Sequence, residues 1–141
     1  MMTEIGEIEM TTAPTNGKPS LFMAEDEEDT ANLLKFLLER SGYHVLHAVD
    51  GHQAQQMIDT MAPPSLALLD IMLPHFSGLQ LLLYIRKKPE WQQVPIIMLT
   101  ADSSEHDIQQ ALAAGANDYM VKPFNPRELA ARLSRFLKPV A

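Results

Sequence analysis

Carboxylate side chains follow two short apolar runs of this sequence. Glu25 and Asp26 come directly after the run at 21–24, and Asp70 comes after the run at 65–69. A carboxylate at the end of a buried strand is costly unless it is paired, bound to a metal or open to water. Three such anions brought together repel one another, and a hard divalent cation with oxygen ligands relieves that repulsion. The sequence therefore predicts a Mg²⁺ site.

Two further polar side chains stand at corresponding places. Thr100 follows the apolar run at 94–99, and Lys122 follows the run at 118–121. A lysine and a hydroxyl opposite the metal would hold the non-bridging oxygens of a phosphoryl group. Asp70 would then be the nucleophile of a phosphoryl transfer. The hypothesis is a phosphoryl-transfer site that joins these side chains to the acids.

The spacing of apolar residues predicts the elements that must position this site. We expect strands at 21–24, 43–48, 65–69, 94–99 and 118–121. Helical periodicity lies between them, for example at Ala54, Met57, Ile58 and Met61. Continuous apolar strands that alternate with helices predict an α/β fold, a parallel sheet of five strands doubly wound with five helices. In such sheets function collects beyond the carboxyl ends of the strands.

The domain organisation is expected to be simple. Residues 1–19 lack periodicity and are punctuated by Pro14 and Pro19, so we interpret them as a flexible N-terminal tail. Residues 20–141 form one predicted domain with room for a sizeable core. The last helix is expected to begin at Asn125, which is followed by Pro126 at its first position.

The composition excludes several classes of function. A net charge of −7 argues against direct binding of nucleic acid. The basic run at 86–88 is interpreted as the solvated end of a helix. Since the sequence has no cysteine, disulfides and thiolate metal sites are excluded. No apolar run approaches the roughly 20 residues that span a bilayer, and residues 1–20 do not resemble a signal peptide, so we expect no membrane contact and a cytoplasmic location.

Four motifs in this sequence resemble those of the receiver domain of two-component response regulators. They are MAEDEEDT at 23–30, LLDIMLPHFSG at 68–78, IIMLTA at 96–101 and GANDYMVKPF at 115–124. The resemblance covers roughly 21–137 and implies a CheY-like, flavodoxin-like fold with strand order 2-1-3-4-5. The C-terminal third is most similar to the winged-helix, OmpR/PhoB-type regulators.

The resemblance implies a role for each site residue. Asp70 would accept a phosphoryl group from a sensor histidine kinase or a small phosphodonor. Asp26, Asp70 and the backbone carbonyl of Met72 would bind Mg²⁺, and Glu25 would act directly or through a water. Lys122 would pair with the phosphoryl group. The function implied is a phosphorylation-dependent switch with self-catalysed phosphoryl transfer and autodephosphorylation, rather than an enzyme with an external substrate.

The resemblance also implies how the switch is read. Thr100 would turn inward to the phosphoryl group, and Tyr119 would follow from an exposed to a buried rotamer. That change would alter the face made by the fourth helix, fifth strand and fifth helix, which binds a downstream protein or an output domain. The chain is expected to be either a stand-alone receiver or part of a longer regulator. A plain core-packing role for Tyr119 stays open.

Some positions depart from the family pattern. Glu25 stands where Asp is commoner, so direct metal coordination by its longer arm is open. Met72 offers no hydrogen bond to a water that would attack the acyl phosphate, so we expect the phosphorylated form to live longer than that of a Met72→Asn variant. Asp102, two residues after Thr100, stands at a second position that tunes this attack. The reversal of the chain within VKPF predicts a cis bond between Lys122 and Pro123.

The resemblance to winged-helix regulators bears on assembly. Asp118 and Arg132 stand where one interchain ion pair of that subfamily is built, and Glu128 stands at another. The predicted helix at 103–115 has no lysine or arginine, so Glu128 is expected to lack its basic partner in that interchain contact. We therefore predict a monomer before phosphorylation and at most weak dimerisation on activation.

Two other functions were weighed from the sequence. DEEDT at 26–30 is a near miss to the Asp-x-Asp-x-Thr motif of haloacid-dehalogenase-like phosphohydrolases, with Glu28 in place of the second aspartate. That alternative leaves Asp70 without a role. A pseudo-receiver that binds partners without phosphorylation is the other alternative, and the complete set of Asp26, Asp70, Thr100 and Lys122 argues against it.

Overall fold

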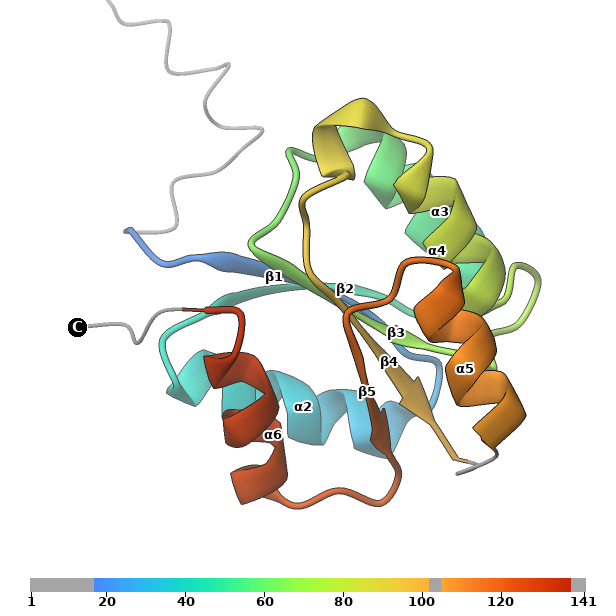
Figure 1. Ribbon diagram of the computed structural model, residues 1–141. Helices are drawn as coiled ribbons and strands as arrows, with labels where there is room; N and C mark the ends of the chain where they lie inside the picture. The colour runs from blue at the N-terminus through green and yellow to red at the C-terminus, as the bar shows by residue number, and fades with distance from the viewer. Residues whose placement is uncertain (1–16, 102–104, 138–141) are drawn as a thin grey trace, which may run out of the picture.

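The computed structural model describes residues 17–101 and 105–137, and in these ranges five parallel strands form one sheet in the order β2-β1-β3-β4-β5. The strands are β1 (Ser20–Ala24), β2 (His44–Ala48), β3 (Leu66–Asp70), β4 (Ile96–Thr100) and β5 (Asp118–Val121). The helices are α2 (Glu28–Arg40), α3 (Gly51–Thr60), α4 (Gly78–Arg86), α5 (Glu105–Ala113) and α6 (Pro126–Ser134), with a 3-10 turn η2 (Pro89–Trp91). Figure 1 shows α2 and α6 on one face of the sheet and α3, α4 and α5 on the other. The predicted doubly wound α/β fold is confirmed.

Alternation along the central strands builds a core on each face of the sheet. In β1, Phe22 packs with Trp91 in the core under α3 and α4, whereas Leu21 and Met23 pack with Leu34 in the core under α2. These five side chains are all fully buried. Because successive strand side chains point to opposite faces, a strand between two helical layers must be apolar throughout.

The observed strand ends differ slightly from the predicted ones. Asp70 and Thr100 are the last residues of β3 and β4 rather than the first residues after them. The start of β4 moves from Val94 to Ile96, because Pro95 has no N–H to donate to the ladder. Its carbonyl nevertheless accepts a bond from Ala67 N–H at 2.9 Å. Both polar side chains therefore belong to the rigid sheet.

The loop after β3 is packed tightly under two helix starts. A Cβ added to Gly78 would collide with the carbonyl oxygen of Asp70, and one added to Gly51 would collide with that of Phe76. Gly78 begins α4, and Ser77 and Gln80 form a capping box that holds this start. Close backbone approach of this kind needs glycine, so these two positions fix the path of the loop.

Arg86 does not lie at a solvated helix end, which corrects that part of the sequence interpretation. Its guanidinium is half-buried and donates to the carbonyl of Gly115 at 2.9 and 3.0 Å and to those of Trp91 and Gln92 at 3.2 Å. These carbonyls lie at or just after the ends of helical segments, where intrahelical donors run out. Arg86 therefore ties the end of α4 to the turn after α5.

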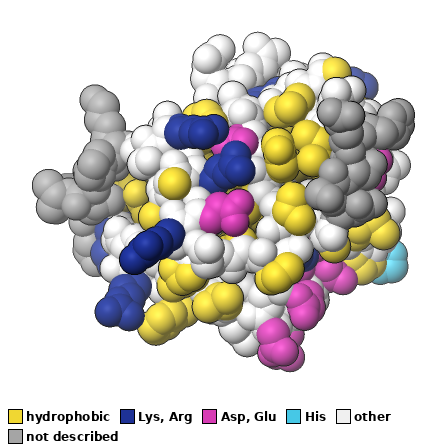
Figure 2. Space-filling view, turned by 60° about the horizontal axis from the view of Figure 1, so that its bottom comes forward, with side chains coloured by type: hydrophobic (Ala, Val, Ile, Leu, Met, Phe, Trp, Pro, Cys, Tyr) yellow, Lys and Arg dark blue, Asp and Glu magenta, His cyan; other side chains and the backbone are white. Residues whose placement is uncertain are grey.

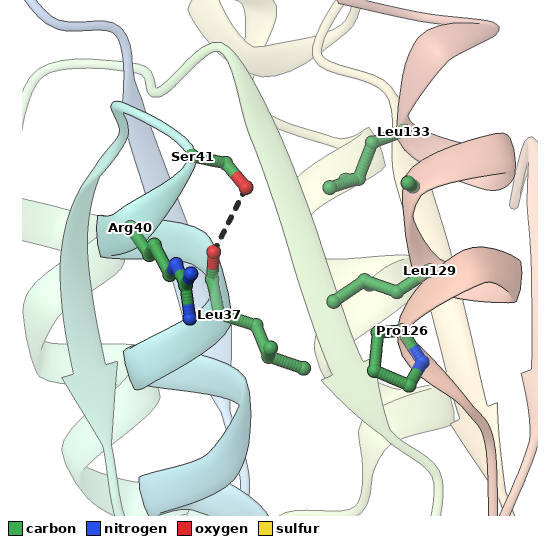
Figure 3. A pocket seen from close by; sticks show the side chains of 7 residues that line it. Leu37, Arg40, Ser41, Pro126, Leu129 and Leu133 are labelled. Carbon is green, nitrogen blue, oxygen red and sulfur yellow. Dashed lines mark hydrogen bonds between the residues drawn. The ribbon is translucent and has the colours of Figure 1, made fainter.

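A hollow lies between α2 and α6, the two helices that cover the same face of the sheet. Leu37 of α2 points toward Leu129 and Leu133 of α6, and the space between them is about 460 Å³ (Figure 3). Arg40 and Ser41 line it at the C-terminal end of α2. The acids at 25 and 26 precede the other end of that helix, so this hollow is separate from the strand-end acids.

In the described ranges no helix is long and apolar enough to cross a membrane.

Candidate functional site

Three carboxylates meet at the carboxyl ends of β1 and β3. Oxygens of Glu25, Asp26 and Asp70 lie within 4.8 Å of one another. Glu25 is fully buried, Asp70 is 3% exposed and Asp26 is exposed. The predicted gathering of these acids is confirmed. Two of the three carboxylates, those of Glu25 and Asp70, are therefore buried, and that of Asp26 faces water.

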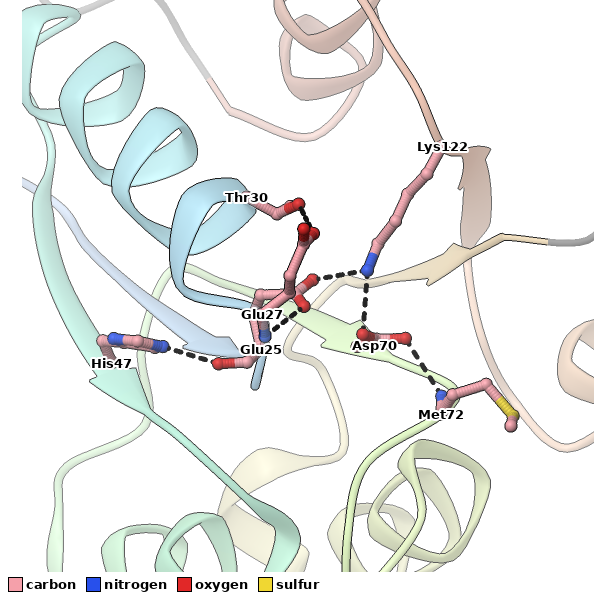
Figure 4. Close-up of polar contacts among 7 residues, drawn as sticks. All are labelled: Glu25, Glu27, Thr30, His47, Asp70, Met72 and Lys122. Carbon is pink, nitrogen blue, oxygen red and sulfur yellow. Dashed lines mark hydrogen bonds and ion pairs between the residues drawn. The ribbon is translucent and has the colours of Figure 1, made fainter.

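Lys122, which directly follows β5, reaches across to two of these acids (Figure 4). Its Nζ lies 2.8 Å from Oε1 of Glu25 and 2.9 Å from Oδ2 of Asp70. Its backbone N–H donates to the carbonyl of Thr100 at 2.7 Å, and the bond between Lys122 and Pro123 is cis, as predicted. We call the group formed by Glu25, Asp26, Asp70 and Lys122 the strand-end site.

The second oxygen of each buried acid is held by a backbone N–H. Oε2 of Glu25 accepts from Glu27 N–H at 3.0 Å, and Oδ1 of Asp70 accepts from Met72 N–H at 3.0 Å. These bonds fix both carboxylates before any ligand arrives. The buried acid in the apolar run at 65–70 is therefore tolerated because Lys122 and the Met72 amide both bind it.

Burial sets the electrostatics of the strand-end site. Burial raises the pKa of Glu25 to about 7, although Lys122 and the Glu27 N–H act in the opposite direction and the charge of Asp70 adds to the rise. For Lys122 burial lowers the pKa, but bonds to Glu25 and Asp70 outweigh it and the pKa is raised. Two acids compete for one ammonium, so further positive charge is favourable here.

The donor set fits a hard divalent cation. Carboxylate oxygens are the ligands that Mg²⁺ prefers, and the three acids offer one oxygen each within a 4.8 Å group. The exposed Asp26 leaves one side open to water, which Mg²⁺ usually retains. Oε1 of Glu25 lies 2.8 Å from Nζ of Lys122, and Oε2 accepts from the Glu27 amide. Both oxygens of Asp70 have partners of the same kind, so these contacts leave a direct and a water-mediated role of Glu25 open.

The other predicted site residues surround this group. Thr100, 3% exposed, ends β4, and β4 lies between the strands that lead to Asp70 and Lys122. The side chain of Met72 is 73% exposed in the loop after Asp70. Tyr119 of β5 is half-buried, and the guanidinium carbon of Arg132 lies 5.4 Å from its ring centre. Asp102 and residues 1–16 of the expected tail lie outside the described residues.

A second charged group lies at the opposite end of β5. Asp118, 6% exposed, pairs with Arg132 at 2.7 Å and with Arg135 at 3.2 Å within the same chain. Glu128 lies 3.7 Å from Arg132 within the same helix, because the one-turn spacing on α6 puts the two side chains on one face. The expectation that Glu128 lacks a basic partner across an interchain contact stays a prediction. We call Asp118, Glu128, Arg132 and Arg135 the Asp118 cluster.

Charged side chains of both signs lie among hydrophobic ones on the face of the molecule that Figure 2 draws. The pairing of Asp118 with Arg132 uses within one chain the groups that the sequence analysis assigned to an interchain contact. An interchain role for them stays a prediction.

One contact of the strand-end site has no counterpart in the sequence interpretation. Nε2 of His47 on β2 lies 2.8 Å from the backbone carbonyl oxygen of Glu25. The histidines of the sequence have no metal-type spacing, and that criterion gave no reason to single out His47. The only available signal was its position near the end of β2, the strand expected beside β1.

Comparisons with known proteins agree with this geometry. Residues 21–134 match the response regulator receiver domain. The chain is similar to the alkaline phosphatase synthesis transcriptional regulatory protein PhoP of Bacillus subtilis and to the transcriptional regulatory protein CpxR of Escherichia coli, each 42% identical over 118 residues. The alignments cover 84% of this chain but 48% of PhoP and 49% of CpxR. The chain thus spans about half the length of these curated relatives.

Solved structures show the same fold. The chemotaxis protein CheY4 of Vibrio cholerae aligns with a TM-score of 0.80 and 28% identity over 86% of this chain and 100% of that one. The receiver domain of the sensor histidine kinase PA1611 from Pseudomonas aeruginosa aligns with a TM-score of 0.78 and 32% identity, over 85% of this chain and 98% of that one. The PA1611 structure holds a magnesium ion in its active site cleft.

Proposed function

Because this chain belongs to the response regulator receiver domain family, we propose that it is a signalling switch that accepts a phosphoryl group on Asp70 with the help of Mg²⁺. One observation carries the proposal: the Asp70 carboxylate, at the end of the central strand β3, lies 2.9 Å from the Lys122 ammonium and beside two further acids. The family match sets aside the phosphohydrolase alternative, which gives Asp70 no role.

The residues of the strand-end site divide the work of the transfer. A carboxylate oxygen of Asp70 attacks phosphorus, and the bond from phosphorus to the donor nitrogen or oxygen breaks with its electron pair left on the donor. The Met72 N–H and Lys122 hold the carboxylate in place before the attack. Lys122 then stabilises the negative charge on the transferred group. The acyl phosphate that results is the switched state.

Mg²⁺, when bound, neutralises charge on the phosphoryl oxygens. Asp26, Asp70 and the backbone carbonyl of Met72 would hold it, and Glu25 would act directly or through a water. The magnesium ion in the active site cleft of the PA1611 receiver domain supports this assignment.

The switch is read at a distance from Asp70. Thr100 moves toward the phosphoryl group, Tyr119 follows, and the face of α5, β5 and α6 changes its partner binding. The proposed donors are a sensor histidine kinase and small acyl phosphates. Since the curated relatives are transcriptional regulators about twice as long as the match, a downstream protein or an output domain is the proposed reader. A cytoplasmic location is proposed with this role.

Phosphorylation by acetyl phosphate tests the proposal. With Mg²⁺ the protein should gain the mass of one phosphoryl group, as measured by intact-mass spectrometry, and it should gain none in the presence of a chelator. Asp70→Asn should gain none. Asp118→Asn, which changes a buried acid at the other end of β5, should be labelled like the parent. Equal labelling of Asp70→Asn and the parent would overturn the proposal.

A further inference from the structure

The backbone between β1 and α2 carries Glu25 and Asp26, two of the three acids of the strand-end site. The position of this backbone therefore decides where the two acids lie. The N–H of Glu25 donates to the carbonyl of Ala48 on β2 at 3.1 Å, which extends the β1–β2 ladder by one bond. Beyond that bond the two strands part. β2 ends at Ala48, and the chain turns into α3 with Asp50 as its N-cap.

Because the strands part there, β2 offers no backbone N–H to the carbonyl of Glu25. In a parallel ladder its donor would be the N–H two residues beyond Ala48, which belongs to Asp50 at the helix start. A carbonyl on a fully buried residue needs a partner, since an unsatisfied one costs about 1 to 3 kcal/mol by general measure. Here the partner is the side chain of His47, with Nε2 at 2.8 Å (Figure 4).

We propose that His47 is a positioning residue, which fixes the Glu25–Asp26 backbone so that the acids of the strand-end site are set for Mg²⁺. The inference rests on the proposed function. A carbonyl oxygen only accepts, so Nε2 must carry the proton that it donates. His47 and Ala48 then hold the carbonyl and the N–H of Glu25, and the Glu27 N–H holds its carboxylate. Asp26 lies between these fixed points.

A matched pair of variants isolates the donated proton. His47→Gln keeps an N–H at a similar reach, and His47→Met keeps the length of the side chain without the donor. Removal of a hydrogen bond that orients metal ligands typically weakens metal affinity about 10- to 100-fold. We expect His47→Met to bind Mg²⁺ about tenfold more weakly in calorimetric titration, and His47→Gln to recover most of the loss. His44→Met, at the far end of the same strand, should bind like the parent.

Equal Mg²⁺ affinity for His47→Met and the parent would overturn the positioning role and leave the proposed function intact. Equal weakening of His47→Gln and His47→Met would overturn it too, because the ring rather than the N–H would then matter. A parent protein that binds no Mg²⁺ would overturn the proposed function and this role together.

A second measurement uses the parent protein without Mg²⁺, so it does not depend on whether a variant folds. Long-range proton–nitrogen NMR of the metal-free parent protein reports which ring nitrogen of His47 carries the proton. A proton on Nε2 is expected. A neutral ring protonated only at Nδ1 would overturn the proposal.

Discussion

Each end of β5 carries a group of charged side chains built on a buried carboxylate, and the two groups differ in their balance of charge. At its carboxyl end, the strand-end site places three acids around one lysine, a formal excess of two negative charges. At its amino end, the Asp118 cluster matches two acids with two arginines. Both groups pair a buried carboxylate with a cation at 2.7 to 2.9 Å. Distance alone therefore does not tell a functional charge group from a structural one.

The balance of charge makes the difference. Asp118 has two guanidinium partners and the N–H of Tyr119, so it gains little from another cation. Glu25 and Asp70 share one ammonium, and burial leaves Glu25 with a raised pKa. A site that remains negative after its internal pairing binds an added cation and then an anion, which is what phosphoryl transfer requires.

Removal of the single cation of the strand-end site should have the largest effect. Lys122→Met keeps the Met72 amide on Asp70 but takes away the charge that faces the phosphoryl group. We expect phosphorylation by acetyl phosphate to slow at least about 100-fold, since loss of one preorganised donor typically costs that much. Intact-mass time courses measure the rate. A rate within a few fold of the parent rate would contradict the functional difference drawn between the strand-end site and the Asp118 cluster.

The matching change at the other end should act on stability instead. Asp118→Asn removes the charge that Arg132 and Arg135 share, and hydrogen bonds to charged groups contribute about 1.5 to 3 kcal/mol. Because Arg132 is partly exposed and keeps Glu128, we expect a loss of about 1 to 2 kcal/mol in the free energy of unfolding. Urea denaturation measures it. Slow phosphorylation with unchanged stability would contradict the structural role.

The exposed loop beside Asp70 should set the lifetime of the phosphorylated state. Met72 is 73% exposed and its side chain offers no hydrogen bond to an attacking water. Met72→Asn supplies one, so the acyl phosphate should decay a few fold faster after removal of the donor. Phosphoprotein gels or intact mass follow the decay. Slower decay in the variant would refute the argument.

Assembly should show the smallest effect. Arg132 is engaged with Asp118 and Glu128 in its own chain, and exposed ion pairs between chains add only about 0 to 1 kcal/mol each. Light scattering should therefore find a monomer without phosphate and at most weak dimerisation with beryllofluoride. A tight activation-dependent dimer that Arg132→Ala abolishes would show that the Asp118 cluster serves an interface.

The sequence predicted the strand-end site well because each residue follows or ends a strand. The carboxyl ends of parallel strands lie on one edge of the sheet, so strand positions alone bring Glu25, Asp26, Asp70 and Lys122 together. Boundaries were harder to place. Asp70 and Thr100 fall inside the strands because the backbone ladder continues past the last apolar side chain.

Contacts between side chains and backbone carbonyls escaped the sequence interpretation. Arg86 was read as a solvated helix end, but carbonyls from η2 and the turn after α5 converge on it only in the folded chain. His47 was passed over because its partner is a backbone oxygen, which carries no sequence signal.

The location of the phosphoryl group tests the central claim most directly. Protein labelled with acetyl phosphate and Mg²⁺ is reduced with borohydride, which converts an aspartyl phosphate to homoserine, and peptide mass spectrometry then identifies the converted residue. The account predicts conversion at Asp70 alone, because only this acid ends the central strand with Lys122 at 2.9 Å and the Met72 amide on its other oxygen. Conversion at Asp26 or Asp118 with Asp70 intact would contradict it.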